Sequence, residues 1–312
     1  MTLIAGKRLV IFGCGYIGSE VARHALTRGV QVTALTRNPA KAEELRGGGI
    51  TTVVADLASD RWHQELAGEF DFVLNAVSSG GGGTEGYRHS YVEGMRSMLR
   101  WADSCDGIGT LVYTSSTSVY PQDGGVVIDE SASTSGSGER PQILLEAENL
   151  LRQGCFSRAA HASPEEAKRA SPINRCFILR LAGIYGPGRT HLVDQVRSGT
   201  VAGRGDHHLN LAFRDDIVTA IWSAFESPPA IGADVFNVVD DYPTPKEQIV
   251  RWLAEQLGVP VPVFTGVAVA GRRAVTPDRR ISNAKLKAVL GWKPHYPTFR
   301  DGYKNMLALA AD

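Results

Sequence analysis

Hydrophobic residues recur along the first two thirds of the chain as short, nearly continuous runs. These runs cover residues 9–12, 30–35, 51–55, 72–76, 111–115, 176–181 and 235–238. The segments between them have helical spacing, as in residues 16–28, where Ile17, Val21 and Ala25 share one face. Strands that are apolar throughout suit a sheet covered on both faces, and their alternation with helices is typical of parallel sheets. The pattern predicts a doubly wound α/β fold.

After residue 180 the regular alternation stops, and proline-bearing loops and short helices follow. Helices are expected near residues 246–257, 282–290 and 300–310. We therefore expect a sheet domain over residues 1–182, with a return segment at about 211–240. The rest of 183–312 is expected to form a smaller α/β lobe that closes over the carboxyl edge of the sheet. The polar segment at about 158–174 predicts an exposed insertion.

Composition and charge narrow the class of protein. The 312 residues include 33 Lys and Arg against 33 Asp and Glu, so no overall basic field attracts nucleic acid or anionic lipid. The four cysteines lack metal-site or disulfide spacing, and the start lacks the apolar stretch of a signal peptide. Adjacent His207 and His208 have no third ligand nearby, so no metal is expected. These features predict a soluble cytoplasmic protein that binds neither nucleic acid nor membrane.

A glycine motif follows the first apolar run. Residues 13–18, Gly-Cys-Gly-Tyr-Ile-Gly, match G-x-G-x-x-G between a strand and a helix, which is the context that gives this pattern meaning. Gly13 would permit the tight turn, Gly15 the approach of a pyrophosphate, and Gly18 the close packing of helix on strand. The helix N-terminus would then favour the bound anion. The motif predicts a nicotinamide dinucleotide cofactor.

The residue after the second strand bears on which cofactor is bound. A carboxylate there binds the ribose of NAD, but this strand is followed by Arg37, whose guanidinium suits the 2′-phosphate of NADP. NADP is therefore expected, with NAD and a merely solvated Arg37 as the alternatives. Asp56 is placed to meet the adenine amino group or to cap the following turn. The expected cofactor-binding residues are Gly13, Gly15, Tyr16, Ile17, Gly18, Arg37, Asp56, Leu57, Ala76, Val77 and Ser115.

Later segments resemble the extended short-chain dehydrogenases/reductases, the NAD-dependent epimerase/dehydratase group. Residues 111–120 (LVYTSSTSVY) are similar to the family's fifth strand, and 180–189 (RLAGIYGPGR) to its sixth strand and the following loop. Asn210, residues 214–217, 236–241 and 290–294 continue the resemblance in order, over nearly the whole chain. The resemblance implies a Rossmann sheet, a C-terminal substrate lobe, and an active site of Ser or Thr with Tyr and Lys.

The resemblance fails at the Tyr and Lys. By alignment Ser116 takes the Ser/Thr position and would hold a substrate oxygen. Arg140 and Leu144 stand where the family has Tyr and Lys, and residues 121–167 contain neither residue type. The pattern is similar to the atypical branch of this superfamily.

Two tyrosines are candidates to replace the missing acid. Tyr91 stands where relatives carry an Asn close to the catalytic Lys, although packing is the favoured interpretation of it. Tyr185 follows the carboxyl end of the sixth strand, the edge where open α/β sheets bind ligands. The glycine run at residues 80–83 follows the fourth strand at the same edge and is expected to form a lip beside the nicotinamide, or a simple connector.

Two functions remain open. One is an NADP-dependent oxidoreductase or epimerase/dehydratase relative that acts on a small polar hydroxyl or carbonyl compound, with Ser116, Tyr91 and Tyr185 as catalytic candidates. The other is a non-catalytic NAD(P)-binding sensor or regulatory module on the same fold. The family often dimerises through two helices, near residues 85–103 and 142–153. Apolar residues there permit a homodimer or pack only against the sheet, namely Met95, Met98, Leu99, Leu144, Leu145 and Leu151.

Overall fold

A computed structural model describes residues 4–159, 172–267 and 277–309 of the chain. It divides into two compact units. The sheet unit comprises Met1–Val119, Ser137–Arg180 and Ala220–Phe236, and the C-terminal unit comprises Tyr120–Gly136, Leu181–Thr219 and Asn237–Asp312. None of the helices within the described residues combines the length and apolarity needed to cross a bilayer.

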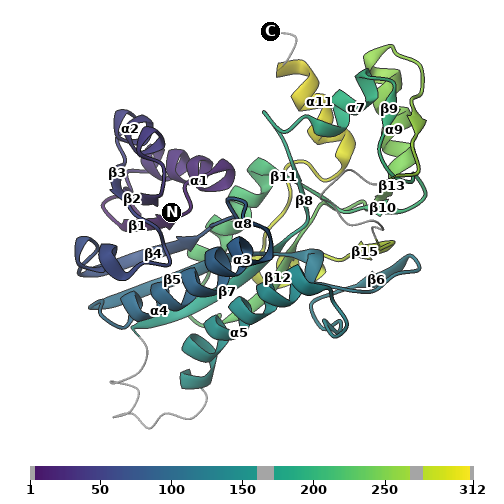
Figure 1. Cartoon of the computed structure of the whole chain (residues 1–312). Coiled ribbons are helices and arrows are strands. Elements are labelled where there is room, and N and C mark those ends of the chain that lie inside the picture. The colour runs from purple at the N-terminus through teal and green to yellow at the C-terminus, as the bar shows by residue number, and fades with distance from the viewer. Residues whose placement is uncertain (1–3, 160–171, 268–276, 310–312) are drawn as a thin grey trace. The chain divides into compact units, whose positions relative to one another are not determined.

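The predicted sheet is confirmed, with seven strands in the order β3-β2-β1-β4-β5-β7-β12 (Figure 1). The strands are β1 (Arg8–Phe12), β2 (Gln31–Thr36), β3 (Thr51–Val54), β4 (Glu69–Asn75), β5 (Gly107–Ser116), β7 (Ile173–Leu181) and β12 (Asp234–Val238). The pairs from β3 to β5 run parallel. Because β1 has β2 on one side and β4 on the other, the strand order reverses there, which is where open α/β sheets bind ligands.

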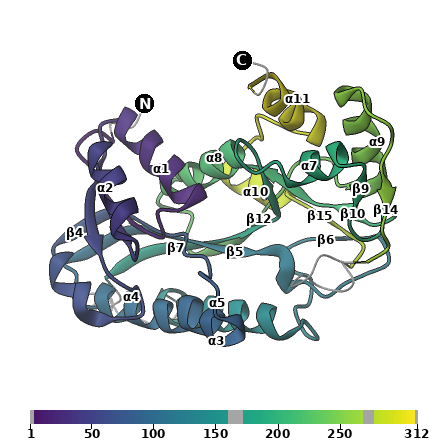
Figure 2. The ribbon, with the colours of Figure 1, turned by 45° about the horizontal axis from the view of Figure 1, so that its top comes forward.

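Helices lie on both faces of this sheet, so the fold is doubly wound (Figure 2). They are α1 (Tyr16–Thr27), α2 (Pro39–Gly47), α3 (Gly83–Arg88), α4 (Gly94–Ala102), α5 (Glu139–Ala159) and α8 (Arg214–Phe225), with short turns η1 (Asp60–Glu65), η2 (His89–Glu93) and η3 (Thr117–Val119). On the α4 and α5 face, Phe12, Trp62 and Trp101 pack with ring centroids 5.0–5.5 Å apart. On the other face, Phe72 packs against Phe225 of α8.

Two expectations about these helices need correction. The helix expected over 85–103 is interrupted by η2, a π-helical turn. The insertion expected at 158–174 is shorter at both ends, because α5 continues to Ala159 and β7 begins at Ile173, which is buried. Residues 160–171 lie outside the described residues.

The C-terminal unit consists of two-stranded pairs and short helices. The pairs are β6 (Val126–Ile128) with β15 (Arg279–Ile281), β8 (Gly183–Tyr185) with β11 (Leu211–Phe213), β9 (Thr200–Val201) with β14 (Val263–Phe264), and β10 (His208–Leu209) with β13 (Thr244–Pro245). The helices are α7 (His191–Arg197), α9 (Lys246–Leu257), α10 (Ala284–Leu290) and α11 (Phe299–Leu309). The helix expected at 246–257 has those bounds, and the other two are offset by one or two residues. The apolar core includes Tyr185, Phe213, Phe299 and Tyr303.

Gly302 of α11 lies directly against this aromatic core. A Cβ atom on Gly302 would overlap the Tyr185 hydroxyl, and would lie 2.7 Å from Tyr185 Cζ and 2.8 Å from Phe213 Cδ2. The Tyr185 hydroxyl is buried and has no hydrogen-bond partner among the residues that the structure describes. Tyr185 is therefore packed into the core at a position that requires glycine on α11.

We expect Gly302→Ala to destabilise the protein. Overpacking costs about 1–3 kcal/mol, which exceeds the gain of about 1 kcal/mol in helix propensity. Tyr185→Phe removes the overlapping hydroxyl, so the double variant should recover part of the loss in urea unfolding. Gly47→Ala in helix α2, where a Cβ meets nothing within 4 Å, is the matched control. A Gly302→Ala protein as stable as the control would contradict the packing.

Candidate functional site

The turn after β1 has the geometry that a dinucleotide requires. Gly13 has φ of +86°, and a Cβ on it would lie 2.6 Å from Val77 N, so only glycine fits. A Cβ on Gly18 would lie 2.5 Å from Gly13 O and 3.1 Å from Ile11 Cγ2. A Cβ on Gly15 would meet nothing within 4 Å. Two glycines are thus needed for packing, while Gly15 faces open space.

The start of α1 adds an electrostatic reason for anion binding at this open position. Gly15 is the N-cap residue, no side chain caps the helix, and its first turn holds no acidic residue. Helix N-termini of this kind attract phosphate groups. Tyr16 and Ile17 form the first turn, and Ala76 and Val77 line the turn from the end of β4. The residues present fit the pyrophosphate of a dinucleotide.

Arg37 lies just beyond the end of β2. Its side chain is exposed, and within the described residues no hydrogen bond or ion pair engages its guanidinium. The next residue, Asn38, caps α2 by accepting hydrogen bonds from the Ala40 and Lys41 N–H groups at 2.9 and 3.3 Å. The cap fixes the backbone next to Arg37. The guanidinium of Arg37 remains exposed and can bind an anion.

Asp56 follows β3 and has two protein partners. Its Oδ1 accepts a hydrogen bond from Ala58 N–H at 2.9 Å, and its Oδ2 lies 3.0 Å from His89 Nε2. Burial raises the pKa of Asp56, but these hydrogen bonds more than offset it, so the pKa is lowered overall. Asp56 therefore caps the following turn, as one of the two interpretations predicts. Its contact with adenine stays a prediction. Leu57 is buried against Gly94 of α4, whose missing side chain leaves it room.

Ser115 and Ser116 end β5 and have different surroundings. Ser115 is buried and donates a 2.6 Å hydrogen bond to Glu148 Oε1, so its side chain is already used within the protein. Ser116 is half-buried, and its Oγ accepts a hydrogen bond from Ser118 N–H at 3.1 Å. Its hydroxyl proton is not used in that bond. Ser116 thus keeps a donor for a substrate oxygen.

Sequence reasoning missed a buried ion pair beside these serines. Arg180 of β7 donates to Glu148 of α5 through Nε at 3.0 Å and Nη2 at 2.6 Å. The two side chains are 4% and 1% exposed. One signal existed in the sequence: a glutamate on the apolar face of a helix and an arginine within an apolar strand.

The two positions that correspond by resemblance to the family's Tyr and Lys are occupied by Arg140 and Leu144. Arg140 is exposed in the first turn of α5, with its guanidinium carbon 5.8 Å from the centre of the Tyr87 ring. Leu144 is buried, 1% exposed. An exposed cation and an aliphatic side chain cannot form the usual proton-transfer pair.

Tyr91 lies in the π turn η2, within a group of phenols. Its ring centroid is 4.5 Å from that of Tyr87. Burial raises the pKa of Tyr91 well above its usual value, and Tyr87 adds to the effect. Tyr91 also packs against the core of the sheet unit. Its phenol therefore stays protonated at neutral pH.

Tyr185, the other candidate acid, belongs to the C-terminal unit. It is 4% exposed, and burial strongly raises the pKa of its phenol. It also borders a hollow of about 900 Å³ within that unit. Polar side chains around the hollow include Arg189, Gln195, Arg204, His207, Asn210 and Lys246. Of the described residues, no three or more His, Cys, Asp or Glu are grouped to hold a metal ion.

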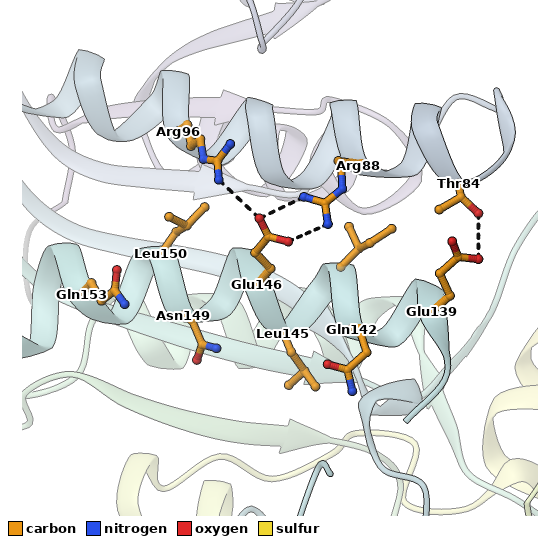
Figure 3. A pocket seen from close by; sticks show the side chains of 11 residues that line it. Thr84, Arg88, Arg96, Glu139, Gln142, Leu145, Glu146, Asn149, Leu150 and Gln153 are labelled. Carbon is orange, nitrogen blue, oxygen red and sulfur yellow. Dashed lines mark hydrogen bonds and ion pairs between the residues drawn. The ribbon is translucent and has the colours of Figure 1, made fainter. Parts of the chain in front are cut away.

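The outer faces of α3, α4 and α5 enclose a second hollow of about 550 Å³ (Figure 3). Glu146 accepts hydrogen bonds from Arg88 at 2.9 and 2.7 Å and from Arg96 at 3.3 Å. The apolar residues expected here divide: four are buried in the core, namely Met95, Met98, Leu144 and Leu151, and two are partly exposed, Leu99 and Leu145. A homodimer through this largely polar face stays a prediction.

Fold and glycine turn together define a dinucleotide-binding protein of the Rossmann type. The chain belongs to the NAD-dependent epimerase/dehydratase family, whose model matches residues 9–238. It is 26% identical over 297 residues to protein YeeZ of Escherichia coli (strain K12), covering 93% of this chain and 97% of that protein. It is 27% identical over 265 residues to 2-alkyl-3-oxoalkanoate reductase of Stenotrophomonas maltophilia (strain K279a), covering 81% and 76%.

Solved structures share the fold at lower identity. A UDP-glucuronic acid 4-epimerase from Bacillus cereus, in complex with UDP-glucuronic acid and NAD, has a TM-score of 0.75 at 17% identity, covering 97% of this chain and 99% of that one. MoeE5 in complex with UDP-glucuronic acid and NAD has a TM-score of 0.77 at 20% identity, covering 98% and 99%. The predicted family and fold class are thus confirmed.

The buried ion pair yields a stability prediction. Glu148→Gln leaves the Arg180 charge buried without its carboxylate, and we expect a loss of about 3–5 kcal/mol in unfolding free energy. Adding Arg180→Met should cost less than the sum of the two single losses, because the orphaned charge is gone. Urea unfolding of the four proteins measures this cycle.

The control for this cycle is Glu146→Gln, on the same helix but in a partly exposed pair with Arg88. Such pairs contribute about 0–1 kcal/mol. Equal losses for Glu146→Gln and Glu148→Gln, or strict additivity of the buried pair, would refute the assignment.

Proposed function

We propose that the protein is an NADP-dependent oxidoreductase that acts on a small polar carbonyl or hydroxyl compound. The observation that carries this is the exposed guanidinium of Arg37 at the end of β2, which forms no hydrogen bond or ion pair with the described residues. A planar guanidinium binds a phosphate through two parallel hydrogen bonds, whereas the carboxylate of an NAD-type site would repel it. NAD is the alternative cofactor, in which case Arg37 is only a solvated surface residue.

The protonation state of the phenols favours reduction over oxidation. When bound, a reduced nicotinamide would supply hydride for a carbonyl carbon, and the residues of the chain would have to provide a proton for the carbonyl oxygen. Burial raises the pKa of Tyr91, so its phenol is protonated at neutral pH and would give its proton only to a stronger base, such as the alkoxide that reduction of a carbonyl produces. Ser116 would hold the substrate oxygen while Tyr91 protonates it. The name of the Stenotrophomonas relative, a 3-oxoalkanoate reductase, agrees with this direction.

The C-terminal unit contains a ligand-sized hollow of its own. Its hollow is lined by charged and amide side chains, among them Arg189, Gln195 and Lys246, which suit a polar rather than a purely aliphatic compound.

All four cysteines lie within the described residues and are free thiols, which agrees with the reducing cytoplasm as the place of action.

A second function is favoured by the exposed Arg140 and the buried Leu144. An NAD(P)-binding module without turnover needs no acid/base pair, and these residues cannot form one. The two proposals share the cofactor and differ in whether the bound cofactor is consumed.

Arg37→Ala tests the cofactor. We expect about 10- to 100-fold weaker binding of NADPH, because a charge-assisted bond to the 2′-phosphate is lost, with NADH binding unchanged. Fluorescence titration of both cofactors measures this. If the wild-type protein binds both equally and the substitution alters neither, the NADP proposal is overturned.

Tyr91→Phe tests the reaction. With carbonyl compounds and NADPH, we expect turnover to fall about 100-fold or more, because a positioned proton donor is lost. The wild-type rate of reduction should stay level from about pH 6 to 9, because the pKa of Tyr91 is raised and its phenol remains protonated there. Tyr242→Phe, an exposed tyrosine, is the control. A wild-type protein that binds NADPH yet never oxidises it with any carbonyl compound would be the non-catalytic module.

A further inference from the structure

The guanidinium of Arg37 lies against the backbone of Gly80. A Cβ atom built on Gly80 would overlap Arg37 Nη2, and would lie 3.3 Å from Cζ and 3.7 Å from Nη1. Gly80 is absent from the residues of positive φ, unlike Gly81, Gly82 and Gly83, whose φ values are +108°, +80° and +62°. The backbone conformation at position 80 is therefore open to any residue. Glycine is required there because a side chain would overlap the guanidinium of Arg37.

The chain after Gly80 is closely packed. The carbonyl of Gly81 packs on Gly86 of α3, where a Cβ would overlap Gly81 O and lie 3.0 Å from Gly81 C. Because the loop has little room on this side and Arg37 is exposed, we expect a side chain at position 80 to displace the guanidinium of Arg37 and not the loop.

We propose that Gly80 is a specificity-determining residue for the cofactor, acting as a positioning residue for Arg37. Without a side chain, Gly80 leaves the space that the guanidinium of Arg37 occupies beside the loop after β4, and so limits where its N–H groups can lie. Bidentate recognition depends on the orientation of that planar group, so a displaced guanidinium keeps its charge but loses paired geometry. The inference rests on the proposed role of Arg37 and names the residue that sets its orientation.

Gly80→Ala is the direct test, with NADPH and NADH as probes. We expect NADPH binding to weaken by about 5- to 10-fold, part of the loss for Arg37→Ala, while NADH binding is unchanged. The urea midpoint should also stay unchanged, because the displaced group is the mobile end of an exposed side chain. In the Arg37→Ala background, Gly80→Ala should cause no further loss of NADPH affinity.

The matched control is Gly47→Ala at the end of α2, where a Cβ meets nothing within 4 Å and φ is not positive. Equal weakening of NADPH and NADH by Gly80→Ala, or the same loss with and without Arg37, would overturn the positioning role. If Arg37→Ala is selective and Gly80→Ala has no effect, only this inference fails. If Arg37→Ala is not selective, the NADP proposal fails with it.

Discussion

The buried pair of Glu148 and Arg180 fixes the rotation of helix α5. Charges removed from water are tolerated only where partners satisfy them, and here two bonds from Arg180 and one from Ser115 hold one carboxylate. Residues four apart share a helix face, so an inward Glu148 places positions 144 and 140 one and two turns earlier on the same side. The resemblance places the family's Tyr and Lys at these two positions, which here hold Arg140 and Leu144.

Phenols are concentrated close to this altered helix. Tyr87 and Tyr91 pack ring to ring, and the buried hydroxyl of Tyr113 has no hydrogen-bond partner within the described part of the chain. An unsatisfied buried hydroxyl costs about 1–3 kcal/mol, so such groups persist mainly where something else requires them. Electrostatic interactions among these three phenols and Glu148 raise the pKa of Tyr113 beyond the large effect of its burial.

The seven strands of the sheet and most helices could be predicted from the sequence, because apolar runs and helical spacing follow directly from burial on two faces. The glycine motif could also be predicted, since Gly13 and Gly18 are required by contacts within one strand, turn and helix. Ser116 depended on resemblance alone, and its free donor became visible only in the structure.

Other features depend on contacts between residues distant in sequence, which patterns along the chain do not reveal. The bond between Glu148 and Arg180 joins a helix to a strand 32 positions away. The contact between Arg37 and Gly80 joins the ends of two strands, and the sequence marked Gly80 only as one glycine in a run. The short strand pairs of the C-terminal unit lack periodicity because each strand has only two or three residues.

The π turn at His89–Glu93 lies between α3 and α4. The number of residues in this turn therefore sets how the side chains before it are oriented relative to those after it. Such a turn holds one residue more than an α-helical turn, and each residue of an α-helix advances the side chain by about 100°. A chain that lacked one residue here could still bury Met95 and Met98 of α4. The deletion would rotate the preceding residues, so Arg88 would no longer face Glu146 and His89 would no longer face Asp56. A one-residue deletion would thus alter the site as thoroughly as a substitution, while every side chain type was retained.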